Sequence, residues 1–403
     1  MTNPETAILQ HHVDLARTVF SPSWKANRIS SAPGRIELIG NHLDYNGGPV
    51  LAAAIDRRIW ISAGENQLHY LRAVFSDFGD DPPVSITVEE HWGWTSSGGA
   101  PTPVDYLRGT VAALSGRGHH VQGSLDLVVS GDLPHGVGIS SSAALCVALT
   151  QAISQESLEP SELVLTAQEA ENRAGSPCGT MDQSASVFGE VIRFDGATNN
   201  VNSISAELGS FEFLIANSGV VRSLASSSYP TRVVESHSAV KLLKNLFGPS
   251  LQSLAHITED RLEAVESTLG QSGNVSLFPR VRHVVTETAR VNEAAGALRA
   301  ADWTGFGALM TASGRSSALD YEISHPDVEE LVRHCLDTPG VVGARMMGGG
   351  EGGSALVLLD SRARSHLISA LRERYYTPRS IDGLENMVIP CRFDRGASVR
   401  SAP

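Results

Sequence analysis

The chain has 403 residues, which is enough for two or three domains with a large hydrophobic core. Its net charge of −13 argues against a nucleic acid or an anionic membrane as partner, but local donors and a metal ion can still hold a nucleotide. No apolar run approaches the roughly 18 residues that cross a bilayer, and the N-terminus lacks a signal-peptide pattern, so we expect a cytoplasmic protein.

The first half of the chain alternates between helix and strand patterns. Hydrophobic periodicity predicts helices at residues 7–20, 104–114, 143–153 and 161–173, and strands at 49–55, 59–63 and 124–130. Ser161 is the expected N-cap of the fourth helix. Trp92 and Trp94 lie in a polar loop, where packing is favoured over stacking on a ligand.

The second half is richer in helices. The predicted elements are a strand at 211–216, helices at 231–246, 259–269, 280–300, 302–317 and 326–337, a strand at 356–359, a helix at 361–374 and a strand at 387–393. Ser324 is expected to cap the helix that begins at 326. The glycine-rich loop at 343–353 is expected between a helix and a strand, where its glycines allow close backbone approach to a ligand; a structural hairpin is the alternative.

The cysteines form no C-x-x-C pair and have no histidine at metal-ligand spacing. We therefore expect free, buried thiols in a reducing compartment. Cys178 is the exception, because the residues around it also indicate a functional site. The four cysteines are Cys146, Cys178, Cys335 and Cys391.

Residues 31–48 interleave polar side chains with glycines and with apolar residues that indicate a path through the core. Polar side chains in such a place need hydrogen-bond partners. An arginine beside a histidine and an aspartate suits a hydroxyl-rich ligand near a phosphate. The polar residues are Arg35, Glu37, Asn41, His42, Asp44 and Asn46.

Residues 133–145 follow a predicted strand and lead into a predicted helix through a Gly/Ser-rich loop. Free backbone N–H groups at the positive end of a helix dipole make this a phosphate site on physical grounds, and a plain Gly/Ser turn is the alternative. The loop lacks the lysine of a Walker A motif. Gly136 and Gly138 permit close approach of the backbone, and Ser140 to Ser142 add hydroxyls.

Two acids stand on either side of the Gly/Pro turn that follows the helix at 161–173. Glu171 ends that helix and Asp182 begins another, so both can face one cavity. Asp182 is either an N-cap or a functional acid; Met181 and Phe188 indicate burial, and a buried acid without a role is costly.

Four motifs, taken in this order and spacing, resemble those of the GHMP sugar kinases, and the first is specific for the galactokinase family. They occupy residues 34–48, 133–144, 170–183 and 345–353, and the resemblance spans nearly the whole chain. It implies an α+β fold with a ribosomal-protein-S5-like N-terminal domain at 1–195 and a ferredoxin-like C-terminal domain at 196–403. The activity it implies is ATP- and Mg²⁺-dependent phosphorylation of the anomeric hydroxyl of a hexose, with galactose as the first expectation. We expect a monomer with no nucleic-acid or membrane partner.

The same resemblance assigns roles to individual positions. Arg35 would stabilise the transferring phosphoryl group, Asp182 would orient or deprotonate the sugar hydroxyl, and Ser142 with Glu171 would hold Mg²⁺. The sugar-binding positions are Glu37, Asn41, His42, Asp44, Gly179 and Tyr229. The ATP-binding positions are Pro134, Gly136, Val137, Gly138, Ser140, Ser141, Ser142, Gly348 and Gly349. This set suits phosphoryl transfer, which needs positioned donors, a metal ion and one acid.

The sequence departs from the galactokinase pattern at the sugar motif. Glu37 stands where the family has Asn, and Asn41 stands where it has Glu. Either the acid has moved and still reaches the sugar, or the pocket accepts a sugar altered at C6, such as galacturonate or arabinose. Further departures are Leu43, Val104, Met347, Glu351 and a Glu171-to-Asp182 interval that is one residue short.

Two other functions remain open on the sequence alone. A non-catalytic sugar sensor on the same scaffold would lose residues from the Ser140–Ala144 segment, which is intact here. A GHMP kinase for mevalonate or homoserine is disfavoured by the sugar motif around His42 and by Tyr229.

Overall fold

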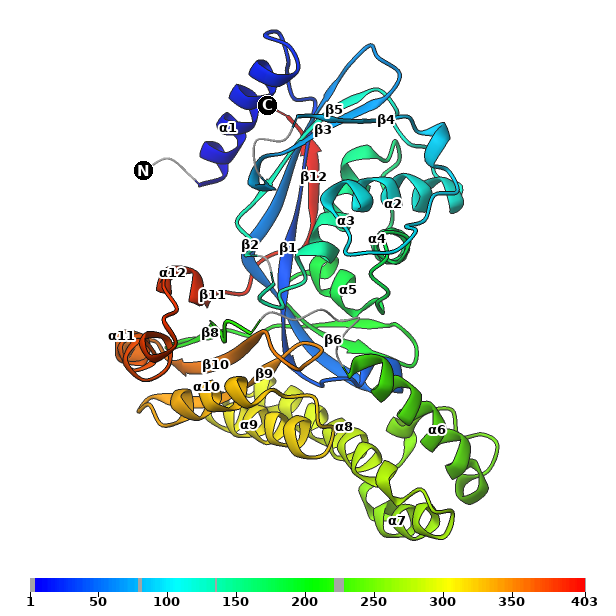
Figure 1. Cartoon of the computed structure of the whole chain (residues 1–403), viewed down its shortest axis with the longest axis vertical. Coiled ribbons are helices and arrows are strands. Elements are labelled where there is room, and N and C mark those ends of the chain that lie inside the picture. Colours follow the sequence, from blue (N-terminus) through cyan, green and yellow to red (C-terminus); the bar gives the residue numbers. More distant parts are fainter. Residues whose placement is uncertain (1–3, 79–81, 135, 221–227, 403) are drawn as a thin grey trace.

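The computed structural model describes residues 4–78, 82–134, 136–220 and 228–402. Two sheets organise these residues, and Figure 1 shows the larger one in the upper part of the molecule and the smaller one below it. The strands of the larger sheet are β1 (Arg28–Ile39), β2 (Pro49–Glu65), β3 (Leu71–Phe75), β4 (Val84–Ile86), β5 (Leu125–Gly131), β6 (Val191–Asp195), β7 (Val201–Ile204) and β12 (Ser398–Ser401). Their order is β12-β1-β2-β5-β3-β4, with β6 joined to β2 and β7 to β6.

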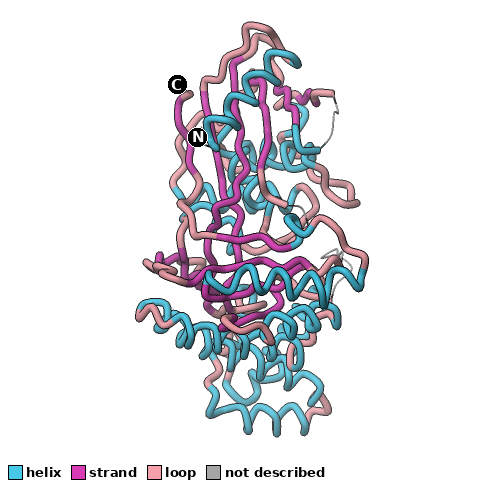
Figure 2. Tube along the Cα trace, turned by 90° about the vertical axis from the view of Figure 1, so that its left-hand side faces the viewer, coloured by secondary structure: helices cyan, strands magenta, loops and turns pink. Residues whose placement is uncertain are grey.

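The larger sheet is antiparallel except where β3 pairs with β5. Its long strands β1 and β2 run along the long axis of the molecule (Figure 1), and Figure 2 shows the same direction from the side. On one face lie α2 (Pro103–Gly116), α3 (Ser141–Ile153), α4 (Pro160–Arg173) and α5 (Met181–Phe188), and on the other lies α1 (Pro4–Val19). Alternation along the strands separates these faces: Leu127 and Val129 join the main core, while Val128 packs with Ala16 of α1.

The smaller sheet has the order β11-β8-β10-β9 and is antiparallel throughout. Its strands are β8 (Phe211–Asn217), β9 (Val341–Met347), β10 (Ser354–Asp360) and β11 (Val388–Cys391). The long helices that lie below it in Figure 1 are α8 (Phe278–Arg299), α9 (Trp303–Leu319) and α10 (Pro326–Leu336). The remaining helices are α6 (Tyr229–Phe247), α7 (Leu262–Gln271), α11 (Arg364–Leu371) and α12 (Leu384–Met387). One hydrophobic cluster runs through both sheets, so the two parts share a continuous core.

The α+β class is confirmed, and most predicted helices are present with shifted ends. The strands expected at 49–55 and 59–63 form a single strand, β2, which continues through the polar residues between them. Arg58 makes this possible, because its buried guanidinium donates to the Asp394 carboxylate at 2.8 Å and to the carbonyls of Arg395 and Gly396 at 2.9 and 2.8 Å. Residues 394–396 therefore satisfy the charge of Arg58, which in the sequence pattern indicates a break between two strands.

Both predicted helix caps were wrong. Glu159, not Ser161, is the N-cap of α4, and it makes no side-chain capping bond. His325, not Ser324, caps α10, and its ring nitrogen accepts from the Asp327 backbone N–H at 3.2 Å. In each case the helix starts at the proline, whose fixed φ suits the first helical position.

Other differences concern the C-terminal half. The helix expected at 361–374 is divided into a short 3₁₀ turn, α11 and a wider π turn at Arg372–Tyr376. The glycine-rich loop joins β9 to β10 rather than a helix to a strand. Two strands beyond the expected boundary at residue 196, β7 and β12, belong to the larger sheet, so the chain returns to the first part at its end.

Candidate active site

Arg35 and Asp182 form the centre of the site. Arg35 lies on β1 at a shift in the pairing with β2, and Asp182 lies in the first turn of α5. The guanidinium donates from Nε to Oδ1 at 2.7 Å and from Nη2 to Oδ2 at 2.8 Å, and Nη1 donates to the Gly138 carbonyl at 2.7 Å. Thr180 is the N-cap of α5, so Asp182 is not the cap that the sequence left open.

The charge of Arg35 is secured by its partner. Burial by itself lowers the pKa of a guanidinium, but the contact with Asp182 outweighs this effect, and the pKa of Arg35 is raised. The pair is more accessible on the acid side, where 25% of the Asp182 side chain is exposed against 8% for Arg35. Asp182 is therefore the more exposed member of the pair.

The Gly/Ser-rich loop ends beside this ion pair at the start of α3. Gly136 and Gly138 have φ of +75° and +82°, and Ser140 has φ +55°, so the backbone turns sharply before the helix begins. The loop packs on β1, because Arg35 N donates to the Ile139 carbonyl at 3.0 Å. The Ser140 hydroxyl donates to Asp182 Oδ2, which links the loop directly to the central acid.

The expected ATP-binding positions of this loop differ in what they expose. Val137 is buried in the core, so only its backbone can face a phosphate. Pro134, Ser141 and Ser142 are half-buried around the helix start. The free N–H groups of the first turn and the helix dipole favour an anion here.

Glu171 and Ser142 lie next to this loop. The Ser142 hydroxyl donates to Glu171 Oε1 at 2.6 Å, and the Gln183 amide donates to Oε2 at 2.7 Å. Burial raises the pKa of Glu171 to about 7. An acid in this state gains from a nearby cation, and the hydroxyl and carboxylate oxygens are the ligands that Mg²⁺ prefers. The donor set fits Mg²⁺, although no cluster of three or more His, Cys, Asp or Glu capable of holding a metal occurs among the described residues.

An aromatic group surrounds the expected sugar residues. The His42 ring lies 5.0 Å from that of Tyr229 and 5.1 Å from that of Tyr321, and its Nδ1 is 2.8 Å from the Tyr45 hydroxyl. Asn46 Nδ2 donates to the His42 carbonyl at 2.8 Å. His42 has φ +60°, so these contacts hold the residue in a backbone conformation that few side chains adopt.

Asp44 lies beside Gly179. A methyl group on Gly179 would stand 3.2 Å from Asp44 Oδ2, so a side chain there would crowd the carboxylate. Burial raises the pKa of Asp44 to about 7, with Glu37 and Asp182 adding to the effect. Three acids thus share one region, which suits a ligand that donates several hydroxyl hydrogen bonds.

Glu37, Asn41 and the glycine-rich loop meet across the two halves of the chain. Arg345 of β9 donates from Nη2 to Glu37 Oε1 at 3.3 Å, and Asn41 Nδ2 donates to the Gly348 carbonyl at 2.8 Å. The His42 ring also contacts the Gly349 carbonyl at 3.3 Å. Burial raises the pKa of Glu37, and Arg345 opposes this effect. Gly348 and Gly349, expected at the nucleotide, are placed against the sugar motif.

Several residues of the site have no role predicted from the sequence. Tyr45 lies inside the sugar motif and could have been proposed from it, but no local pattern indicates that Tyr321, Gln183 and Arg345 lie at the site. The four cysteines are free thiols, as expected, and Cys178 is the least buried of them. Its Sγ accepts from the Gln183 amide at 3.4 Å, which places it beside Glu171.

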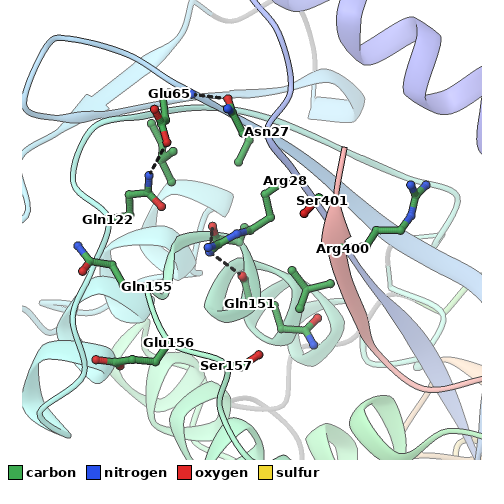
Figure 3. Close-up of a pocket in the computed structure, with 14 residues that line it drawn as sticks. Asn27, Arg28, Glu65, Gln122, Gln151, Gln155, Glu156, Ser157, Arg400 and Ser401 are labelled. Atoms are coloured by element: carbon green, nitrogen blue, oxygen red, sulfur yellow. Dashed lines mark hydrogen bonds between the residues drawn. The ribbon is translucent and has the colours of Figure 1, made fainter. Parts of the chain in front are cut away.

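A cavity of about 330 Å³ lies at the opposite end of α3 from this site (Figure 3). Thirteen residues of helix separate the two ends by roughly 20 Å. Arg28 points into the cavity, where it donates to the carbonyls of Ala152 and Ser154 at the end of α3. A cation at a helix C-terminus stabilises the helix, so Arg28 has a structural role.

The fold and the site define a class of protein. Three family models match the chain. Residues 17–65 match the galactokinase galactose-binding signature, residues 105–190 match the GHMP kinases N terminal domain, and residues 294–377 match the GHMP kinases C terminal domain. The protein is thus a GHMP-type sugar kinase that uses ATP, with the two-domain architecture of that class. Along the described residues, we find no helix with the length and apolarity to cross a membrane.

Similarity to individual proteins narrows the class. The chain is 34% identical to a galactokinase of Roseiflexus sp. (strain RS-1), with 91% of this chain and 92% of the relative covered. It is 33% identical to the Homo sapiens galactokinase, covering 88% and 90%. A crystal structure of Lactococcus lactis galactokinase complexed with galactose superposes with a TM-score of 0.86 at 26% identity, covering 97% and 99%. Methanococcus jannaschii mevalonate kinase shares the fold, with a TM-score of 0.63 at 17% identity, covering 92% and 99%. The chain belongs to the galactokinase family.

Proposed function

We propose that the protein transfers the γ-phosphoryl group of ATP to the anomeric hydroxyl of galactose. The observation that carries this proposal is the two-pronged contact between Arg35 and Asp182, placed where the Gly/Ser-rich loop meets the sugar motif. The galactokinase relatives do not favour the alternatives of a sugar altered at C6 or of a non-catalytic sensor.

Asp182 orients the attacking hydroxyl in this proposal. The anomeric oxygen forms a bond to the γ-phosphorus, the bond from that phosphorus to the bridging oxygen of ADP breaks, and the hydroxyl proton passes to a carboxylate oxygen of Asp182. Because Arg35 donates to both oxygens of Asp182, the plane of the carboxylate is fixed, and the acid acts mainly by orienting the hydroxyl. Arg35 also faces the charge that develops on the transferring group.

Ser142 and Glu171 would hold Mg²⁺, because their oxygens lie 2.6 Å apart next to the start of α3. A metal ion there would neutralise charge on the phosphate oxygens. Residues 134–142 and the N–H groups of α3 bind the phosphates, and the described part of this loop contacts the ion pair through Gly138 and Ser140. Gly348 and Gly349 are proposed to close over the nucleotide from the second half of the chain.

The sugar is proposed to lie between the aromatic group and the acids. His42 and Asp44 bind hydroxyl groups, Gly179 leaves room for them, and Tyr229 covers the ring. Glu37 and Asn41 stay predicted members of the same site. We further propose that the protein is a monomer and that it works in a reducing cytoplasm, in keeping with its free thiols.

We also propose a division into domains near residue 196. Residues 1–195 hold the phosphate loop and the sugar motif, and residues 196–403 hold the glycine-rich loop. The pairing of β7 and β12 with the larger sheet adds residues 201–204 and 398–401 to the first domain.

The test is a panel of sugars with ATP and Mg²⁺, followed by initial rates of ADP formation and by identification of the product. We expect turnover of galactose with the phosphate on the anomeric carbon. Turnover of galacturonate or arabinose but not of galactose would change the proposed acceptor sugar and leave the proposed class, a sugar kinase, unchanged. No ADP formation with any sugar would overturn the proposal.

A further inference from the structure

Asn41 is fully buried, and its polar atoms are directed at the second half of the chain. Nδ2 donates to the Gly348 carbonyl at 2.8 Å, and Oδ1 accepts from the Ser317 hydroxyl of α9 at 3.3 Å. The Asn41 carbonyl contacts the His283 ring of α8 at 3.1 Å. Each of these contacts belongs to the packing between the sugar motif and the C-terminal helices and loop.

Arg345 makes the second set of contacts between the same two segments. It is fully buried on β9, three residues before Gly348. Its Nη1 donates to the carbonyls of Glu37 and Leu38, both at 3.2 Å, and its Nη2 donates to Glu37 Oε1. Glu37 therefore contacts strand β9, and Asn41 contacts the glycine-rich loop that follows β9.

The chemistry of each residue matches its partner. A carbonyl such as that of Gly348 needs a donor, and an ionised carboxylate at position 41 would offer none and would repel it. A buried guanidinium needs an anion, and an amide at position 37 would leave Arg345 without its counter-ion. The acid at 37 and the amide at 41 therefore each match the partner that they meet in this chain, and an exchange of the two would reverse both fits.

We propose that Asn41 and Glu37 are positioning residues that fix the glycine-rich loop to the sugar motif, and that Asn41 acts through Gly348 rather than as a ligand of the sugar. This inference rests on the proposed kinase function for its expected effect on ATP binding. His42 extends the same connection, since its ring contacts Gly349, the next residue of the loop. The residues that bind the sugar and the loop proposed to close over the nucleotide thus form one mechanically connected unit.

The test compares Asn41→Asp with wild type in the full-length protein. Hydrogen exchange of the peptide that covers residues 345–353 reports the loop, and calorimetry reports the dissociation constants of ATP and galactose. We expect faster exchange of the loop and an ATP dissociation constant raised about tenfold by the loss of one donor. The galactose constant should change by less than about threefold, because no sugar contact is removed.

Asn46→Asp is the matched control. Asn46 is also buried in the sugar motif, but its amide donates to the His42 carbonyl and the Tyr321 hydroxyl instead of the loop. This variant should weaken galactose binding and should change exchange at 345–353 less than Asn41→Asp does, because the Asn46 amide does not contact the loop. If Asn41→Asp does not fold, Asn41→Ala removes the donor without adding a charge and should change exchange and ATP binding in the same direction.

A third comparison concerns the charge pair. Arg345→Met alone leaves Glu37 buried without its cation, and the double variant Arg345→Met/Glu37→Gln removes both charges. We expect the double variant to unfold at a higher temperature than the single one. An Asn41→Asp variant that loses galactose affinity while its loop exchanges as in wild type would overturn the proposal. Lack of kinase activity in the wild type would instead refute the proposed function and leave the exchange measurement valid.

Discussion

Arg35 holds both carboxylate oxygens of Asp182, with Nε 2.7 Å from Oδ1 and Nη2 2.8 Å from Oδ2. The two residues are 147 positions apart in the chain, one on β1 and one at the start of α5. A planar fork of this kind fixes the plane of the carboxylate, which a lysine would not do. The orientation of the acid toward a substrate is therefore set by the strand, not by the helix that carries it.

Replacement of Asp182 by asparagine should remove phosphoryl transfer and spare nucleotide binding. The amide does not accept the hydroxyl proton and leaves Arg35 without its charge partner. We expect kcat to fall by roughly 10² to 10⁴, the range typical of a lost acid–base group. A coupled ADP assay measures kcat, and calorimetry measures the ATP dissociation constant. Asp132→Asn, at an exposed pair with Arg57, is the control; near-wild-type turnover by Asp182→Asn would remove the acid from the mechanism.

Replacement of Ser140 and replacement of Ser142 should have different kinetic effects, although the two residues are only two positions apart. The Ser140 hydroxyl donates to Asp182, whereas that of Ser142 donates to Glu171. Ser140→Ala should lower kcat about tenfold through a less constrained acid, with the Mg²⁺ requirement unchanged. Ser142→Ala should instead raise the Mg²⁺ concentration needed for half-maximal rate. The same response from both variants would contradict the separate contacts.

The Mg²⁺ requirement should depend on pH through Glu171. Burial raises the pKa of this acid to about 7, and it must lose its proton to bind a cation. Below pH 7 the Mg²⁺ concentration at half-maximal rate should therefore rise by about tenfold per pH unit, and above pH 8 it should be constant. Initial rates across a Mg²⁺ series at pH 6, 7 and 8, with galactose saturating, measure this shift.

Glu171→Gln is the matched variant for that measurement. It keeps the shape of the side chain and has no proton to lose, so its Mg²⁺ requirement should be high and nearly independent of pH. A Mg²⁺ requirement in the wild type that does not vary with pH would rule out Glu171 as a ligand.

Acid should destabilise the protein through His12. This histidine of α1 is buried between the hydroxyls of Ser62 and Ser130, at 2.8 and 2.6 Å. Burial lowers its pKa from 6.5 to about 4, with His11 adding to the effect. Because the folded value lies below the unfolded one, this contribution to stability is complete above pH 6.5 and is lost as pH falls toward 4.

The free energy of unfolding should fall by about 2 kcal/mol more between pH 8 and pH 5 in wild type than in His12→Gln, which has no group to titrate there. Urea denaturation at the two pH values measures both proteins. Acids elsewhere titrate equally in both chains, so they cancel in the difference. Equal losses in the two proteins would contradict the assignment to His12.

The sequence predicted the members of the proposed site but not the contacts between them. Arg35, Asp182, Glu171 and the loop before α3 were predicted from residue type, spacing and resemblance, because phosphoryl transfer needs a small and recognisable set of groups. The short strands of the larger sheet were missed, since three to five residues carry little periodic signal. The continuous strand β2 was missed because its polar residues are satisfied by a segment more than 300 positions away.

The amino-acid sequence by itself determined the class of chemistry, because the Gly/Ser-rich loop, an arginine and two acids can be recognised from residue type and order. Only the tertiary structure decided which donor bonds to which acid: Ser140 donates to Asp182, Ser142 donates to Glu171, and Arg345 donates to Glu37. These pairings join residues that are 29 to 308 positions apart. Linear spacing cannot encode them, because a buried polar group takes its partner from whichever element the packing of the core brings within hydrogen-bond distance.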